Sequence, residues 1–325
     1  MEKAGIPSWC KSNPLLRATD QGKYNRQAQK FAYPAVSNQY NERGIELTCK
    51  SKTFTMENFL VPVDFSDASA AALQYSFEFN KHFFARLHVM HIFDVPFAAA
   101  AESDAGYSQY ESLKKAYEEN TWDFINLHKG DFHFDMEVAV TSGGHYQSIA
   151  NYAKEKNIDL IILGNKGKGG LRKWFFGSVT QYLLRHSPCP AIAVPSENVP
   201  KELNKIVVCT DLSQPLTDHQ CVVLKKFADK GNAVIDFLHV QDKIEVALPT
   251  ENIAADKIRN VFGKSPVSVP FDHSIGASIN KFLEHNGGEL VVTLPHYHSW
   301  LDSLLLGSET SAMTKLVKAP IMSLP

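Results

Sequence analysis

Residues 159–178 read DLIILGNKGKGGLRKWFFGS, and this stretch decides the fold class. The Leu and Ile residues that follow Asp159 predict a buried strand. Glycines then mark a loop, and Gly177-Ser178 is typical of a helix start. A buried strand, a glycine-rich turn and a helix in this order predict an α/β domain with a parallel sheet.

The same alternation extends outward from this stretch. Upstream, apolar runs predict strands at residues 58–64, 87–93 and 134–140. Helical spacing of apolar residues predicts helices near residues 70–77, 108–127 and 146–156. Downstream, a helix leads to a short strand at residues 191–194. These segments form a unit of about 140 residues with five strands, which predicts a parallel sheet covered by helices.

The pattern then recurs, so the chain contains an internal repeat. Residues 206–213 (IVVCTDLS) match residues 59–66 (FLVPVDFS) at an offset of 147, and residues 289–293 match residues 159–163 at an offset of 130. The difference of 17 residues predicts a shorter middle in the second copy, around its second strand and second helix.

We therefore divide the chain into residues 1–55, a first domain at residues 56–196 and a second domain at residues 204–325. Residues 1–55 carry nine Lys or Arg against four Asp or Glu and show no sustained apolar period, so we expect poor order there. Two interpretations of this basic leader stand: a tail for an acidic partner, or a dispensable extension ahead of the first strand.

Composition and charge exclude several classes of protein. An apolar content of 44% excludes a wholly disordered chain. Subtracting the net +5 of residues 1–55 from the total of −2 leaves −7 on the rest, which argues against a nucleic-acid partner. The longest apolar run, residues 95–101, is too short to cross a membrane, and the first residues lack the apolar core of a secretory signal. Five scattered cysteines without a C-x-x-C pair are typical of a reducing compartment, so we expect a cytoplasmic protein.

The loop at residues 164–178 has the chemistry of a phosphate-binding site. Glycines let backbone amides approach an anion, and a helix start at Gly177-Ser178 offers free amides, a hydroxyl and the positive end of the helix dipole. The same loop carries four cations, at Lys166, Lys168, Arg172 and Lys173. A tight turn alone would also explain the glycines, so this simpler interpretation stands beside the phosphate site.

The glycine spacing separates this loop from two common motifs. It lacks the GxxxxGK[ST] of a P-loop, and Arg172 stands where GxGxxG requires its third glycine. The loop fits G-x2-G-x9-G-[ST] through Gly164, Gly167, Gly177 and Ser178. It thereby resembles the nucleotide-binding signature of the universal stress protein family. Residues 61–66 (VPVDFS) and 184–190 (LRHSPCP) extend the resemblance, which covers roughly residues 56–325.

This resemblance implies two tandem Rossmann-like domains, each with a five-stranded parallel sheet, and ATP, with or without Mg²⁺, at the carboxyl ends of the strands. Pro62 and Ile92 would line the adenine, and Asp64 would hydrogen-bond the ribose. The phosphates would lie on Gly164, Lys166, Gly167, Lys168, Gly177, Ser178 and the amide of Val179. Asp64 ends a buried strand, so helix capping is its alternative role.

The second copy departs from the motif. Leu294 replaces Gly164, Tyr297 replaces Gly167 and Cys209 replaces Pro62. The four loop cations are replaced by His296, His298, Asp302 and Ser303. Asp211 and Gly307-Ser308 are retained. We therefore predict one ATP site per chain, in the first domain. Two loop histidines beside one Asp are weak evidence for a metal site, and we predict none.

The leading functional hypothesis is an ATP-binding regulatory protein of the stress response, with a regulatory protein partner of unknown identity. The motif supplies phosphate donors without an assigned carboxylate pair for Mg²⁺ or a base for water, so we name no catalytic residue. A slow ATPase or self-phosphorylating protein and a nucleotide-free scaffold are the alternatives. Because family members commonly dimerise through their last strands, the resemblance implies pairing of residues 191–194 with 320–323 inside the chain. A homodimer of two chains stays open.

Overall fold

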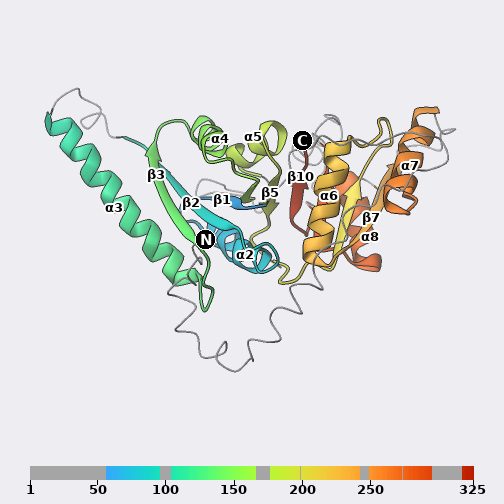
Figure 1. The fold of residues 1–325 in the computed structure, drawn as a ribbon, viewed down its shortest axis with the longest axis horizontal. Helices are drawn as coiled ribbons and strands as arrows, with labels where there is room; N and C mark the ends of the chain where they lie inside the picture. The colour runs from blue at the N-terminus through green and yellow to red at the C-terminus, as the bar shows by residue number, and fades with distance from the viewer. Residues whose placement is uncertain are drawn as a thin grey trace, which may run out of the picture. The chain divides into compact units, whose positions relative to one another are not determined.

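The computed structural model describes residues 56–95, 104–165, 176–197, 199–241, 249–272, 274–294 and 317–325. The expectation of poor order in residues 1–55 lies outside these ranges. The chain from Thr53 to Pro325 forms one compact unit. Within it, the described strands form a single ten-stranded sheet in the order β3-β2-β1-β4-β5-β10-β9-β6-β7-β8 (Figure 1).

In the part of the chain that the structure describes, the first copy contributes five strands and four helices. Its strands are β1 (Asn58–Val63), β2 (Arg86–Phe93), β3 (Met136–Ser142), β4 (Leu160–Gly164) and β5 (Ala191–Val194). Its helices are α2 (Asp67–Asn80), α3 (Asp104–His128), α4 (His145–Glu155) and α5 (Ser178–His186). Neighbouring strands pair in parallel, so the predicted parallel sheet is confirmed.

Helices cover both faces of these strands. α2 and α3 lie on one face, and α4 and α5 lie on the other (Figure 1). β1 and β2 are almost wholly buried because both faces are covered, which explains their nearly continuous apolar sequences. No helix in the described ranges is long and apolar enough to cross a bilayer.

The second copy repeats the strand order of the first. Its strands are β6 (Lys205–Cys209), β7 (Val234–Gln241), β8 (Val267–Pro270), β9 (Leu290–Thr293) and β10 (Ile321–Ser323), with helices α6 (Asp218–Gly231), α7 (Pro249–Phe262) and α8 (Ile275–Asn286). The order β8-β7-β6-β9-β10 matches β3-β2-β1-β4-β5. The predicted shortening falls on the second helix, because α3 has 25 residues and α7 has 14. The second strand keeps its length, since β2 and β7 have eight residues each.

Matching hydrogen bonds tie the first and fourth strands of each copy together. Asp159 accepts hydrogen bonds through Oδ2 from the backbone amides of Glu57, at 2.8 Å, and Asn58, at 3.0 Å. In the second copy, Glu289 accepts hydrogen bonds through Oε2 from the backbone amides of Asn204, at 3.1 Å, and Lys205, at 2.6 Å. The acid before the fourth strand therefore holds the start of the first strand, which gives a structural reason for its recurrence at an offset of 130.

The two copies join through a pair of strands and an aromatic cluster. β5 and β10 pair antiparallel, with Ile192 opposite Met322, which is the pairing that the resemblance implied. On α6 of the second copy, Phe227 has its ring centroid 5.9 Å from that of Phe79 and 5.6 Å from that of Phe83, both in the first copy. All three rings are buried. The copies therefore share one apolar core.

Candidate functional site

The strand order of the first copy reverses between β1 and β4. From β1, the chain runs outward through β2 to β3, and then returns to β4 on the other side of β1. Such a reversal opens a crevice at the carboxyl ends of the two strands, where α/β proteins bind ligands. Asp64 follows β1 and Gly164 ends β4, so the fold brings these two predicted site residues to the same edge of the sheet.

Pro62 and Ile92 lie near this edge on one face of the sheet. Successive side chains along a strand point to opposite faces of the sheet, so residues four positions apart share a face. Pro62 therefore lies on the same face as Asn58 of β1, and Ile92 lies on the same face as His88 of β2. The His88 ring contacts Tyr152 of α4, so this is the face that α4 and α5 cover. Pro62 is half-buried and Ile92 is 8% exposed. Two apolar side chains therefore lie on this face near the carboxyl ends of β1 and β2.

Asp64 organises the turn between β1 and α2. Its Oδ1 accepts hydrogen bonds from the amide of Ser66 at 3.1 Å and from the Ser66 hydroxyl at 2.5 Å. Phe65 adopts a left-handed conformation with φ of 60°. The N-cap of α2 is Ser66, which forms a capping box with Ser69. Asp64 therefore supports the capping residue, and the interpretation of Asp64 as the helix cap itself was wrong.

The second copy builds the same turn. Asp211 accepts a hydrogen bond through Oδ1 from the amide of Ser213 at 2.8 Å, and Leu212 between them has φ of 60°. The retained Asp-x-Ser sequence is therefore explained by the backbone turn alone, and the sequence did not distinguish this role from ligand binding. Asp211 is consequently a matched control for any ligand role of Asp64.

The two ends of the glycine-rich loop meet at the crevice. The amide of Gly177 donates to the carbonyl of Asn165 at 2.7 Å, and the amide of Asn165 donates to the carbonyl of Val194 at 2.9 Å. The hydroxyl of Thr180 donates to the carbonyl of Gly164 at 2.8 Å. The predicted residues Gly164 and Gly177 are thus brought together, whereas Lys166, Gly167 and Lys168 lie outside the described residues.

The start of α5 supplies amides to this edge. Gly177 is the N-cap, with extended backbone and no side-chain hydrogen bond to the first turn. Ser178 is exposed and Val179 is half-buried. Amides in the first turn of a helix lack intrahelical acceptors and carry the positive end of the dipole, so those of Ser178 and Val179 can receive an anion.

Sequence reasoning missed two residues that hold the loop, Asn165 and Thr180. Asn165 forms hydrogen bonds through both its backbone and its side chain, because its Oδ1 also accepts a hydrogen bond from the Ser196 hydroxyl at 3.1 Å. Neither residue belongs to the glycine motif. Phe176 is 7% exposed and packs in the core, while Trp174 and Phe175 lie outside the described residues.

Gly164 has a packing reason of its own. A Cβ added there would lie 2.5 Å from the carbonyl oxygen of Ala68 and 2.6 Å from its carbon, at the start of α2. In the second copy Leu294 stands at this position and is 2% exposed. The N-cap of α6, Thr217, comes later after its strand than Ser66 does in the first copy. The longer connection lets the second copy hold a leucine where the first requires a glycine.

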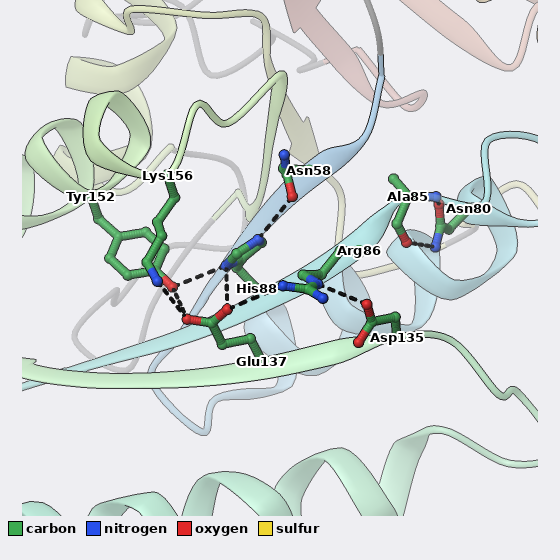
Figure 2. A network of polar contacts seen from close by, with 9 residues as sticks. All are labelled: Asn58, Asn80, Ala85, Arg86, His88, Asp135, Glu137, Tyr152 and Lys156. Atoms are coloured by element: carbon green, nitrogen blue, oxygen red, sulfur yellow. Dashed lines mark hydrogen bonds and ion pairs between the residues drawn. The ribbon is translucent and has the colours of Figure 1, made fainter. Parts of the chain in front are cut away.

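A polar network lies farther from the crevice, on the face covered by α4 (Figure 2). The Nδ1 of buried His88 lies 3.0 Å from the Tyr152 hydroxyl, and its Nε2 lies 3.2 Å from Oδ1 of Asn58. Lys156 donates to Glu137 at 2.8 Å, and this hydrogen bond lowers the pKa of Glu137. Burial lowers the pKa of His88. His91 on the same strand also has a structural contact, since its Nδ1 lies 2.9 Å from the Val63 carbonyl oxygen.

The lowered pKa of His88 predicts a pH-dependent stability. Below about pH 6.5 the unfolded state binds a proton at this residue before the folded state does, so stability falls as the pH decreases and levels off below the folded pKa. The slope from one such group is at most about 1.4 kcal/mol per pH unit. His88→Gln should remove this component from urea unfolding curves measured between pH 7 and 5, whereas exposed His133→Gln should not. Superimposable pH profiles for wild type and His88→Gln would contradict the assignment.

A doubly wound α/β sheet with a crevice where its strand order reverses defines the Rossmann-like class of proteins. Residues 56–195, the first copy of the repeat, match the universal stress protein family. A universal stress protein from Methanocaldococcus jannaschii is 22% identical over 138 residues, which span 42% of this chain and 81% of that protein.

Solved structures extend the likeness of fold beyond this domain. A universal stress protein from Archaeoglobus fulgidus superposes with a TM-score of 0.59 at 15% identity, covering 83% of this chain and 98% of that one. The fold similarity therefore includes the second copy. A universal stress protein in complex with cAMP is 18% identical, with a TM-score of 0.32, over 44% of this chain and 99% of that chain.

Proposed function

We propose that the chain is a regulatory nucleotide-binding protein of the stress response that binds one ATP, with or without Mg²⁺, in the crevice between β1 and β4. The observation that carries the proposal is the meeting of Asp64, Gly164 and the uncapped start of α5 at the reversal of strand order. An acceptor for a sugar hydroxyl and donors for phosphate oxygens thereby lie at one edge of the sheet.

Each part of ATP has a matching set of groups. Pro62 and Ile92 offer the apolar wall that an adenine ring requires, and the Asp64 carboxylate is the acceptor for the ribose. The amides of Ser178 and Val179 and the loop cations Lys166 and Lys168 supply charge of the sign that a triphosphate needs, and Gly164, Gly167 and Gly177 leave room for the backbone to approach it.

One site per chain follows from the differences between the copies. Leu294 fills the position of Gly164 and is buried. Tyr297, His296 and His298 replace the second glycine and two of the cations. A bulky side chain at the strand end and the loss of fixed positive charge both disfavour a triphosphate. The second copy then acts as an internal partner for the first, through β5 and β10.

Binding is favoured over turnover. Phosphoryl transfer requires metal ligands and a positioned base or water-orienting group in addition to phosphate donors. The predicted site offers one carboxylate, Asp64, and its Oδ1 already holds Ser66. We therefore place the protein among nucleotide-responsive modules that act in the cytoplasm on a protein partner, with slow hydrolysis and a nucleotide-free scaffold as the competing outcomes of the test.

The test is isothermal calorimetry of the full chain with ATP and Mg²⁺, comparing Asp64→Asn with Asp211→Asn. Both substitutions keep an Oδ1 acceptor for the turn and remove one negative charge. A hydrogen bond to a charged group contributes about 1.5–3 kcal/mol, so Asp64→Asn should weaken binding by roughly 10- to 100-fold, and Asp211→Asn by less than about 2-fold. Gly167→Val should abolish binding, and Gly307→Val should leave it unchanged.

Three results would overturn parts of the proposal. Two sites per chain, or equal losses in both Asp variants, would contradict a single site in the first copy. No binding heat and no rise in melting temperature with excess ATP would favour the nucleotide-free scaffold, because any ligand that binds the native state stabilises the native state. Phosphate release that survives repurification and disappears in Gly177→Trp would establish the slow ATPase instead.

A further inference from the structure

The ten-stranded sheet ends in two strands that differ as binding edges. β3 has seven residues and no proline, and among the residues that the structure describes it pairs only with β2. β8, at the other end, has four residues and finishes in Pro270. Proline and short length are common devices that prevent an edge strand from pairing with another chain. The first copy lacks both devices on β3.

The outward backbone groups of β3 can be assigned from its pairing with β2. The amide of Leu87 donates to the carbonyl of Asp135 at 2.9 Å, so Asp135 directs its backbone groups toward β2. Backbone groups alternate in direction along a strand. Those of Glu137 and Ala139 therefore also point toward β2, and those of Val138 and Val140 point away from it, toward the open edge.

This open edge forms the floor of a cleft of about 440 Å³. Every β3 residue from Glu137 to Thr141 lines the cleft, as expected when the strand edge itself faces it. α3 contributes Lys114 and Glu118 on one side, and α4 contributes Tyr152 and Glu155 on the other. Figure 2 shows Tyr152 and Lys156 of α4 directed toward Glu137 on β3. The edge strand β3 therefore forms the floor of the cleft, and the helices α3 and α4 form its two sides.

The geometry points to a docking groove for an extended, basic segment of a partner protein, which would add a strand beside β3. Main-chain hydrogen bonds to the outward amides and carbonyls of Val138 and Val140 would supply affinity, and alternate side chains would meet the two helices. This surface is distinct from the β1–β4 crevice and requires no nucleotide.

Charge selects a basic segment. Three glutamates and two lysines line the cleft, so its lining is net acidic. Lys156 neutralises Glu137 through their hydrogen bond. Glu118 and Glu155 form no ion pair with any residue that the structure describes, and they stand on opposite helices. Lysines or arginines of an incoming strand would reach these carboxylates from a backbone paired with β3.

A second copy of this chain fits the groove less well than an isolated strand. Side chains from α3 and α4 line the cleft together with the strand edge. A second copy would bring its own α3 and α4 alongside its β3, so four helices would have to be accommodated around the paired edges. An extended segment without flanking helices avoids this obstruction.

The test uses the full chain and a fluorescein-labelled peptide of alternating Lys and Val, seven residues long to match β3. Fluorescence anisotropy should show binding by wild type, and Val138→Ala should bind within about 3-fold of it. Val138→Pro removes an outward amide without touching the pairing with β2, and should bind at least about 10-fold more weakly. The same peptide with N-methylated valines should bind wild type as weakly as the unmodified peptide binds Val138→Pro. This measurement tests backbone pairing without altering the protein.

Charge is tested separately. The double variant Glu118→Gln/Glu155→Gln should weaken binding several-fold and flatten its salt dependence, whereas Glu111→Gln, exposed on α3 outside the cleft, should do neither. The proposal is overturned if the Lys-Val peptide does not bind, or if the N-methylated or a Glu-Val peptide binds equally well. It is also overturned if wild type dimerises in sedimentation and Val138→Pro does not, because a second copy would then occupy the edge.

Discussion

Phe227→Ala should lower the free energy of unfolding by about 3–5 kcal/mol, a large part of the stability of an ordinary domain. Phe227 is fully buried on α6 and contacts the rings of Phe79 and Phe83 from the other copy. Truncation would remove the apolar transfer energy of the ring and leave a cavity between the copies that helices on both sides hold open. Guanidinium unfolding followed by circular dichroism measures the loss.

The matched control is Phe84→Ala. Phe84 follows Phe83 directly, but the residue is 80% exposed, so its truncation should change stability by less than about 0.5 kcal/mol. Hydrogen exchange then shows where the loss falls. Protection should decrease in β1 and β6 together, since both pack against the shared core. A loss confined to the second copy would contradict a single core and indicate two independently stable halves.

The strands and helices of the first copy were largely predictable because each is decided by local periodicity. The expected strand at residues 58–64 is found at Asn58–Val63, and the expected strand at residues 191–194 is found with the same bounds. A short apolar run of this kind is expected to form a strand in a sheet that helices cover on both faces. The internal repeat was visible because the acid before β4 and the Asp-x-Ser turn have backbone roles in both copies.

The roles of individual residues were less predictable because they depend on contacts between distant parts of the chain. The sequence shows His88 in a strand, but its partners Asn58 and Tyr152 come from β1 and α4. The open edge of β3 depends on the strand order of the whole sheet. The glycine motif spans the end of β4 and the start of α5, yet it gave no sign that Asn165 and Thr180 hold the loop ends.

Folding and the proposed ligand binding both require a residue without a side chain at position 164. The variant Gly164→Ala distinguishes these two requirements. The new Cβ would lie 2.5 Å from the Ala68 carbonyl oxygen, so the start of α2 or the end of β4 must shift. Overpacking against backbone costs about 1–3 kcal/mol and occasionally more, and we expect about 3 kcal/mol here because no flexible side chain can yield. Adding Ala68→Gly should not restore stability, since the closest atoms belong to the Ala68 backbone.

The same shift should reach the proposed nucleotide site, because the start of α2 carries Ser66, which is held by Asp64. Thermal unfolding with and without ATP distinguishes the two demands. A large loss of stability without nucleotide assigns Gly164 to the fold, and its part in the motif is then packing of β4 against α2. Unchanged stability with lost ATP binding would contradict the packing role and leave approach to phosphate as the reason for this glycine. Leu294→Gly is the reciprocal variant: it should destabilise the second copy by about 2–5 kcal/mol through a cavity, without creating a nucleotide site.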